Sequence, residues 1–434
     1  MITRRKSLGY VYALALFTGL LARNAHAEKV IFKDGDWEVY TDGRVGGYVS
    51  YVHGDGLPQS AYKNGVQIHD IAGGGLSGIA DRQAIGTDGE VTQGTIDRWR
   101  VHTGFIGNTL GLGVRGKLDE QNTIVGYTQM WSYIEAQQQR KGSPNPPDVR
   151  QAYVQVTGPW GDVLIGRYRT LFSRGATDID VMYAHRWGVG YSGGATDSYG
   201  PTQGQVGFGV LGSGFASGIQ YGTPTVGGLK LTLGIFDPVA LQGAWDRTRL
   251  PRPEAELTFE QPLGAIGKVV LFGNGAYQDL YKRDSSEHTH AAGFGYGGRL
   301  ELGAFHLGVA GHYGKGLGLN YALEPSDATL DYTAALRKFD GYYVQAQVVL
   351  GRFDVFAGAG ITRVFLGPND LLTDANGNIP HSVVKSQTGI NGGVVFNIKP
   401  WLHLDVDYFR AQFAWFLGEK QNVDNYNAGL VFNW

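Results

Sequence analysis

The side chains best suited to chemistry gather in one long segment that follows a predicted hairpin. The hairpin consists of the strands Gln151–Thr157 and Asp162–Arg169, joined by a tight turn at Gly158–Gly161. The next segment, residues 171–204, shows no alternation of polar and apolar residues. Its charged or imidazole side chains include Asp178, Asp180, His185, Arg186 and Asp197. Long loops between strands are uncommon and are usually functional, so we expect this segment to carry the function.

Two glycine-rich motifs resemble catalytic and nucleotide-binding signatures. Gly190–Gly194 fits the Gly-x-Ser-x-Gly pattern of a nucleophile elbow, with Ser192 in the nucleophile position. Such an elbow requires a strand before it, a helix after it and triad partners, and this context is missing. Gly207–Gly212 fits Gly-x-Gly-x-x-Gly, but no helix follows and no βαβ unit is present. The sequence therefore predicts no catalytic residue and no nucleotide cofactor.

Two other patterns bear on metal binding. Asp374–Asn378 has the spacing that starts a calcium loop, but no Glu closes it. His288 and His290 lie two residues apart in a predicted external loop, where polar side chains are common. The chain contains no Cys, which excludes disulfides and Cys-based zinc sites. We expect neither a cofactor nor a bound metal.

The elements that position these side chains have a period of two almost throughout. Leu229, Leu231, Leu233 and Ile235 alternate with polar residues or glycine, and Leu402–Tyr408 repeats the pattern. Strict alternation is typical of a strand with one apolar face and one polar face. Counting such segments gives about 16 strands of about ten residues each, an even number as membrane barrels of single chains require.

The connections between these strands also alternate in length. The short ones include Asp119–Asn122, Gly158–Gly161 and Leu263–Gly267. The long polar ones include residues 54–94 and 171–204. Short turns on one side and long loops on the other are typical of outer-membrane β-barrels. The sequence thus predicts an all-β transmembrane barrel whose long loop, residues 171–204, folds into the bore and narrows it.

The N-terminus has the features of a secretory signal peptide. A basic start is followed by an apolar stretch and by the small-residue site Ala25–Ala27, which predicts cleavage before Glu28. Residues 1–27 would then be removed, and residues 28–434 would form a single barrel domain. The 37 basic residues lose four and the 39 acidic residues lose none, leaving a net charge of −6. This balance makes nucleic acid an unexpected partner.

A soluble β-sandwich or solenoid is the alternative that alternation alone leaves open. Two features argue against it. The apolar faces carry aromatic residues at strand ends, as membrane-interface girdles do. The chain also stops on that face: Phe432 and Trp434 are expected at the membrane interface.

Several hairpins resemble those of the trimeric general porins of Gram-negative bacteria. Gly111–Gly116 with Ile124–Tyr133 is similar to that family's early hairpin. Ala152–Val156 with Leu164–Arg167 resembles the hairpin before its constriction loop. Tyr426–Trp434 resembles its closing strand. The order and spacing of these short motifs extend the resemblance over essentially the whole mature chain.

The resemblance implies a constriction between acids on the inward loop and bases on the barrel wall. The loop acids would be Asp178 and Asp180. The wall bases, identified by motif position or as additional candidates, would be Arg44, Arg115, Arg167, Lys117, Arg150 and Arg169. Facing charges in a narrow aqueous bore orient dipolar solutes and bias ion passage. The resemblance also implies a homotrimer in the outer membrane, in contact with lipid and lipopolysaccharide.

Three functions are consistent with these features. The first is passive diffusion of small hydrophilic solutes and ions. The second is a channel selective for sugars or an anion, for which Tyr183, Trp187 and Tyr191 in the inward loop would provide stacking surfaces. The third is a barrel enzyme with Ser192 as nucleophile, or an adhesin that binds through its long loops.

Overall fold

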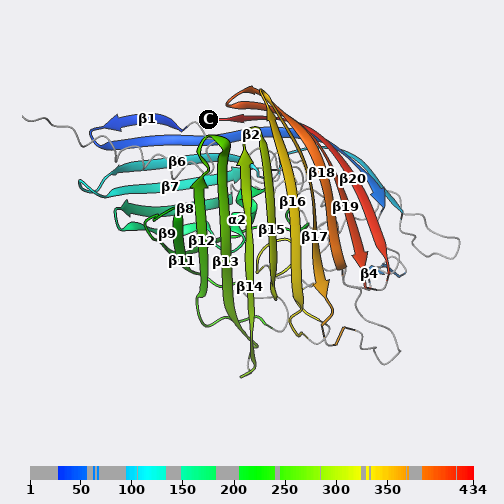
Figure 1. Cartoon of the computed structure of the whole chain (residues 1–434). Helices are drawn as coiled ribbons and strands as arrows, with labels where there is room; N and C mark the ends of the chain where they lie inside the picture. The colour runs from blue at the N-terminus through cyan, green and yellow to red at the C-terminus, as the bar shows by residue number, and fades with distance from the viewer. Residues whose placement is uncertain are drawn as a thin grey trace, which may run out of the picture.

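The computed structural model describes a β-barrel with almost no helix (Figure 1). The described residues are 28–55, 62–63, 66–67, 94–104, 106–132, 148–181, 205–239, 245–283, 285–323, 329–331, 334–367, 369–370, 384–416 and 418–434. The predicted signal peptide, residues 1–27, lies outside them.

All the strands of the main sheet pair antiparallel with their neighbours. The strands are β1 (Lys29–Asp34), β2 (Trp37–Asp55), β5 (Thr95–His102), β6 (Asn108–Lys117), β7 (Thr123–Ser132), β8 (Asp148–Gly158), β9 (Gly161–Arg169), β10 (Phe215–Gly222), β11 (Leu229–Phe236), β12 (Arg252–Pro262), β13 (Gly267–Tyr281), β14 (His288–Leu302), β15 (Phe305–Lys315), β16 (Lys338–Leu350), β17 (Phe353–Phe365), β18 (Val384–Lys399), β19 (Leu402–Trp415) and β20 (Lys420–Asn433). Outside this sheet, the described residues also form a small hairpin, a short α-helix and a 3-10 turn, namely β3 (Tyr62–Lys63) with β4 (Val66–Gln67), α2 (Arg174–Ile179) and η4 (Gly264–Ile266).

The sheet closes because β2 pairs with strands from both ends of the chain. One edge of β2 pairs with β20, from Arg44↔Asn433 onward. The other edge pairs with β6 and then with β5, which together fill one strand position interrupted at residues 103–107. β1 pairs only with β2. The eighteen strands of the sheet therefore occupy sixteen positions of a closed barrel, which confirms the predicted fold and strand number.

The period of two separates an apolar outer face from a polar inner face. On β11, Leu229, Leu231, Leu233 and Ile235 are 37–55% exposed, whereas Thr232 between them is 8% exposed. Closed barrels can cross lipid because every strand pairs on both edges and leaves few backbone groups without a partner. The exposed apolar face is therefore the surface that meets the hydrocarbon.

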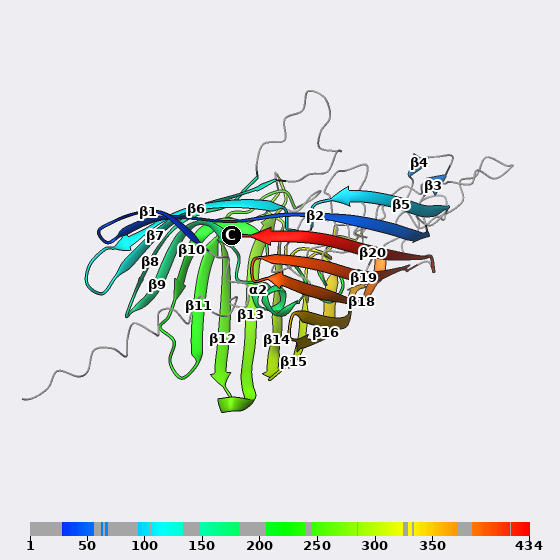
Figure 2. The ribbon, with the colours of Figure 1, turned by 90° about the horizontal axis from the view of Figure 1, so that it is seen from above.

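The connections keep the predicted alternation of lengths. Short turns join β6 to β7, β8 to β9, β12 to β13 and β14 to β15, whereas long connections lie at the opposite end of the barrel. At the start of one of these, the segment after β9 turns inward, and Figures 1 and 2 show α2 inside the ring of strands. No helix in the described residues is long and apolar enough to cross a membrane.

The C-terminal residue completes the closure next to β1. Trp434 exchanges two backbone hydrogen bonds with Gly43, with N–O distances of 2.8 and 3.0 Å. The Trp434 indole lies over Gly43, where a Cβ atom would come within 2.2 Å of the ring. The ring also stacks on Phe432, with 5.7 Å between centroids. Gly43 is thus a close-approach position required by the terminal aromatic residue.

We predict that Gly43→Ala weakens barrel closure, because the added methyl group displaces the Trp434 ring. The free energy of unfolding, measured by urea titration in detergent micelles, should fall by about 1–3 kcal/mol, as is usual for overpacking. Gly126→Ala on β7 is the matched control, since a Cβ there meets nothing within 4 Å. An equal effect in a Trp434→Ala background would show that the ring is not the cause.

Candidate functional site

The inward segment begins at the inner face of β12. The backbone N–H groups of Leu171 and Phe172 both donate to Glu254 Oε2, each at 2.7 Å. The N–H of Ser173 donates to Asn274 Oδ1 of β13 at 3.2 Å. Glu254 is only 5% exposed, and Arg252 Nε lies 2.8 Å from its other oxygen. A buried carboxylate with these partners fixes the chain as it leaves β9.

Helix α2 is held to the same wall by a buried ion pair. Arg174 Nη2 lies 2.8 Å from Glu256 Oε2, and the two side chains are 19% and 2% exposed. Burial disfavours the charge on Arg174, but the nearby Glu256 outweighs it and raises the pKa of the guanidinium. Farther along, the N–H of Val181 donates to Gln345 Oε1 of β16 at 2.6 Å. Residues 171–181 therefore lie against the inner faces of the strands from β12 to β16.

The first predicted loop acid meets one of the predicted bases. Arg169 Nη1 lies 2.6 Å from Asp178 Oδ1, and its Nη2 donates to Thr177. The Asp178 side chain remains 34% exposed. The pair joins the end of β9 to α2, so Arg169 supports the segment locally and does not approach Asp178 from an opposite wall.

Asp180 has a different environment from Asp178. It is 1% exposed, and its Oδ2 accepts the backbone N–H of Gln205 at 2.9 Å. This contact joins the two described ends of the long loop, whose residues 182–204 lie outside the described part. A carboxylate so deeply buried holds the loop together and contributes little to the surface of a bore.

Two of the predicted wall bases point inward but have acidic or aromatic neighbours on the wall itself. Arg44 is 3% exposed and donates to the hydroxyl of Tyr48 at 3.2 Å, which in turn donates to Asp405. Arg115 pairs with Glu38 at 2.9 Å and with Glu28 at 2.6 Å. Arg115 lies near the short turn that follows β6, so its contacts are at the end of the barrel that faces away from the long loops.

The remaining predicted bases lie elsewhere on the barrel. Lys117 pairs with Asp36 at the same short-turn end, and Arg150 pairs with Asp148 on its own strand. Arg167 differs from the prediction, because it is in register with Ala152 and Ser217, which are both exposed. It shares a strand face with Ile165, which is 55% exposed. The register thus places Arg167 on the apolar outer face, contrary to the expected inner one.

A second inward segment was missed by sequence reasoning. Residues 205–214 follow the loop and lie against β16–β19: Gly209 N donates to Thr362 Oγ1 at 2.9 Å, and Gln387 Nε2 donates to Gly207 O at 2.7 Å. Gly209 has a φ of 107°, and a Cβ there would lie 2.3 Å from the carbonyl oxygen of Tyr342. The glycines of Gly207–Gly212 thus allow this backbone to approach the barrel strands closely. This glycine-rich stretch was the one feature of the sequence that could have indicated a second inward segment.

This second segment helps to fill one side of the lumen with an apolar core. Phe208 packs edge-on against Phe409 and Phe413 of β19, with 5.0 and 5.8 Å between centroids. The cluster also takes in residues from the β15–β16 connection and from the inner faces of β16–β20. An ion pair buried at 2% exposure, Arg337 with Asp370, joins two long connections nearby. The inner faces of β18 and β19 are consequently covered.

The opposite wall carries a row of four tyrosines, of which Tyr127, Tyr153 and Tyr168 are partly exposed and Tyr40 is 5% exposed. Tyr40 and Tyr127 are 6.3 Å apart between ring centroids, Tyr127 and Tyr153 are 5.5 Å apart, and Tyr153 and Tyr168 are 5.1 Å apart. The Tyr127 hydroxyl donates to both oxygens of Asp42, at 2.8 and 2.9 Å. We call these four residues the tyrosine row. It crosses β2, β7, β8 and β9, and phenol rings share this wall with Arg115, whose guanidinium carbon lies 4.7 Å from the centre of the Tyr40 ring.

Most of the other candidate residues fall outside the part of the chain that the structure describes. Ser192, Tyr183, Trp187, Tyr191 and Asp374–Asn378 lie outside the described residues. His288 and His290 are exposed at the start of β14 and contact Tyr281 and Tyr277 respectively. Within the described part of the chain, no group of three or more acidic or imidazole side chains could hold a metal ion.

Comparisons with solved structures show the same fold. The outer membrane channel DcaP of Acinetobacter baumannii has a TM-score of 0.63 at 12% identity, covering 94% of this chain and 100% of that one. An anion-selective porin from Comamonas acidovorans has a TM-score of 0.57 at 14% identity, covering 92% and 100%. OmpT of Vibrio cholerae, in a structure described as its trimer form, has a TM-score of 0.50 at 12% identity, covering 92% and 100%.

The sequence itself matches a family model. No curated protein sequence matches the chain significantly. The model described as Gram-negative porin matches residues 12–434, which is nearly the whole length. The chain therefore belongs to the Gram-negative porin family and is a channel of the bacterial outer membrane.

Proposed function

We propose that the protein lets small hydrophilic solutes and ions diffuse passively across the outer membrane, and that it has no enzymatic activity. The observation that carries this proposal is the anchoring of residues 171–181 to Glu254, Asn274, Glu256 and Gln345. These contacts hold residues 171–181 inside the barrel, and Tyr127, Tyr153 and Tyr168 on the facing wall are partly exposed. A polar passage narrowed by a fixed segment suits size-limited diffusion.

The proposed path runs between the inward segment and the strands β7–β9. Inner-face residues there, such as Gln151 and Tyr153, are partly exposed, whereas Gln387 and Asn425 on β18 and β20 are 0% exposed. The aqueous route is thus displaced toward one wall. Asp178 lies in the segment facing this route, and its partial exposure supports a role in ion selectivity.

The assembly we propose is a homotrimer surrounded by lipid and lipopolysaccharide. The family resemblance implies this state, and the trimer form of the structurally similar OmpT agrees with it. The apolar outer face described above would supply both the lipid contact and the contact between subunits.

Purified protein reconstituted in a planar bilayer should produce stepwise increases in ion conductance. Each step would report the insertion of one channel assembly, because a water-filled bore conducts without a carrier cycle. A barrel that inserts but does not conduct would contradict the diffusion function and leave only a binding or enzymatic role.

The two loop acids should respond differently to neutralisation. Asp178→Asn leaves Arg169 without its carboxylate, so the reversal potential in a salt gradient should shift toward anion preference. The change in permeability ratio should be at most about fivefold, since a unit charge at 4 Å in water contributes about 1 kcal/mol. Asp180→Asn should instead increase proteolysis of the loop. An unchanged reversal potential in Asp178→Asn would remove this residue from the ion path.

The tyrosine row favours a second candidate, a channel selective for sugars. Aromatic rings provide apolar contact area, and their hydroxyls can hydrogen-bond to the edges of a sugar. Alternatives with a catalytic Ser192 or ligand-binding loops have no comparable support in the described residues.

Sugar selectivity predicts that maltose added to the bath interrupts the ion current. The double substitution Tyr127→Ala and Tyr153→Ala should raise the half-blocking concentration by about tenfold, because each ring contributes about 0.5–1.5 kcal/mol of contact. Tyr296→Ala on the outer face is the control, since that ring is 45% exposed on the lipid side. Equal blockade in all variants would exclude the row as a sugar site.

A further inference from the structure

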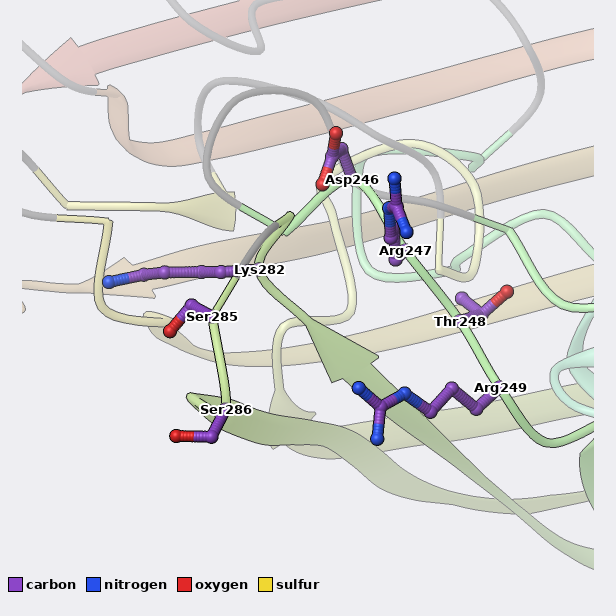
Figure 3. A pocket seen from close by; sticks show the side chains of 7 residues that line it. All are labelled: Asp246, Arg247, Thr248, Arg249, Lys282, Ser285 and Ser286. Carbon is purple, nitrogen blue, oxygen red and sulfur yellow. The ribbon is translucent and has the colours of Figure 1, made fainter.

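A hollow of about 710 Å³ lies at the long-loop end of the barrel (Figure 3). One side is formed by Asp246–Arg249, in the connection between β11 and β12. The other side is formed by Lys282, Ser285 and Ser286, in the turn between β13 and β14. The long loops of outer-membrane barrels are extracellular, so this hollow is accessible from outside the cell.

The two sides of the hollow are fixed relative to each other. Arg247 and Tyr281 exchange two backbone hydrogen bonds, with N–O distances of 3.2 and 2.8 Å. Lys282 pairs with Glu287 across the turn, and its ammonium lies 5.2 Å from the centre of the Trp245 ring. A site that is already ordered loses less entropy when a ligand binds.

The charge of the lining is positive. Arg247, Arg249 and Lys282 contribute three positive charges, and Asp246 contributes one negative charge, so the lining carries +2. Asp246 is paired with Arg283 at 2.7 Å, which directs its negative charge toward a partner outside the lining. Lys282 is paired with Glu287. Counting Arg283 and Glu287 together with the lining residues adds one positive and one negative charge, so the net charge remains +2. Asp284 lies outside the described residues.

Two of the donors, Arg249 and Ser285, keep hydrogens that a ligand could accept. The Arg249 guanidinium carbon lies 4.2 Å above the Tyr281 ring, a contact that uses the face of the group and leaves its N–H edge free to donate. Figure 3 shows Arg249 extending from its connection toward the turn that carries Ser286. Ser285 Oγ accepts the N–H of Glu287 at 3.0 Å, so its own hydrogen can be donated elsewhere.

We propose that this hollow binds a phosphate-bearing group. A phosphate ester carries a charge of about −1.5 to −2 at neutral pH, which matches the charge of the lining. Its tetrahedral oxygens accept hydrogen bonds from the fork of an arginine and from hydroxyl groups, both of which are present. The group could belong to a lipopolysaccharide headgroup at the rim of the barrel or to a free phosphate in the medium.

The test uses the purified full chain in detergent micelles and two probes. Inorganic pyrophosphate binding is measured by titration calorimetry, and diphosphoryl lipid A binding is measured by co-elution in mixed micelles. The double substitution Arg247→Gln and Arg249→Gln should weaken binding of at least one probe by about tenfold or more, as expected for losing a charge-assisted hydrogen bond. Lys338→Gln is the control, because Lys338 is an exposed base at the same end of the barrel but outside the hollow.

A second variant guards against a folding defect in the first. Ser286→Asp places a negative charge at an exposed position and should weaken binding of the same probe while bilayer conductance is retained. If the variants lose only lipid A binding, the site binds a lipid headgroup. If they lose only pyrophosphate binding, the site binds a free anion. The proposal is overturned if neither probe binds the unmodified protein, or if all variants bind equally.

Discussion

In the hydrocarbon of a membrane, backbone groups find no water to hydrogen-bond to, and this requirement shapes the whole barrel. Lipid offers no partner for an N–H or C=O group, so a chain that crosses as strands must close its sheet. Here closure rests on β2, which pairs with β20 on one edge and with β5 and β6 on the other. Once closure is satisfied, the alternation of each strand places apolar side chains in lipid and leaves the inner face for polar and loop contacts.

The inner face is used in two different ways. Along β12, β13 and β16, polar side chains such as Glu254 and Asn274 accept backbone N–H groups and hold residues 171–181 in place. Along β19, aromatic residues such as Phe409 and Phe413 pack with Phe208 into an apolar core. One part of the lumen is therefore organised by polar anchors and another by hydrophobic packing. The exposed remainder lies beside the tyrosine row.

The strands were predictable because their signal is local. Leu229–Ile235 alternates without exception, and a period of two in exposed apolar residues has few explanations other than a half-apolar sheet. The outward position of Arg167 was also readable, since it lies two residues from Ile165 on the same strand. The inner partners were not predictable, because they join distant parts of the chain: Tyr48 donates to Asp405, which is 357 residues away. Nothing in the alternation of either strand indicates which inner-face groups meet across the lumen.

In the long loop, residues 171–204, the environment of each acid likewise depends on contacts that the sequence does not indicate. Asp178 and Asp180 are equivalent in sequence, yet one is partly exposed beside Arg169 and the other is buried against Gln205 N. The path of the chain alone determines that the Asp178 carboxylate is partly exposed, where it can act on ions, and that the Asp180 carboxylate holds the loop together. The glycine-rich stretch 207–212 was correctly rejected as a nucleotide site, but its use for close approach to β16 depends on the closed barrel.

The proposed path carries water and ions beside β7–β9, whereas the β18–β19 side of the lumen is filled. The protein contains no Cys, so single cysteines can be introduced and labelled with a charged thiol reagent during current recording. Gln151 and Gln387 are both inner-face residues near the long-loop end, on β8 and β18 respectively. If the current follows this path, labelling blocks the current through Gln151→Cys and leaves the current through Gln387→Cys unchanged. Block at Gln387→Cys with no effect at Gln151→Cys would contradict it.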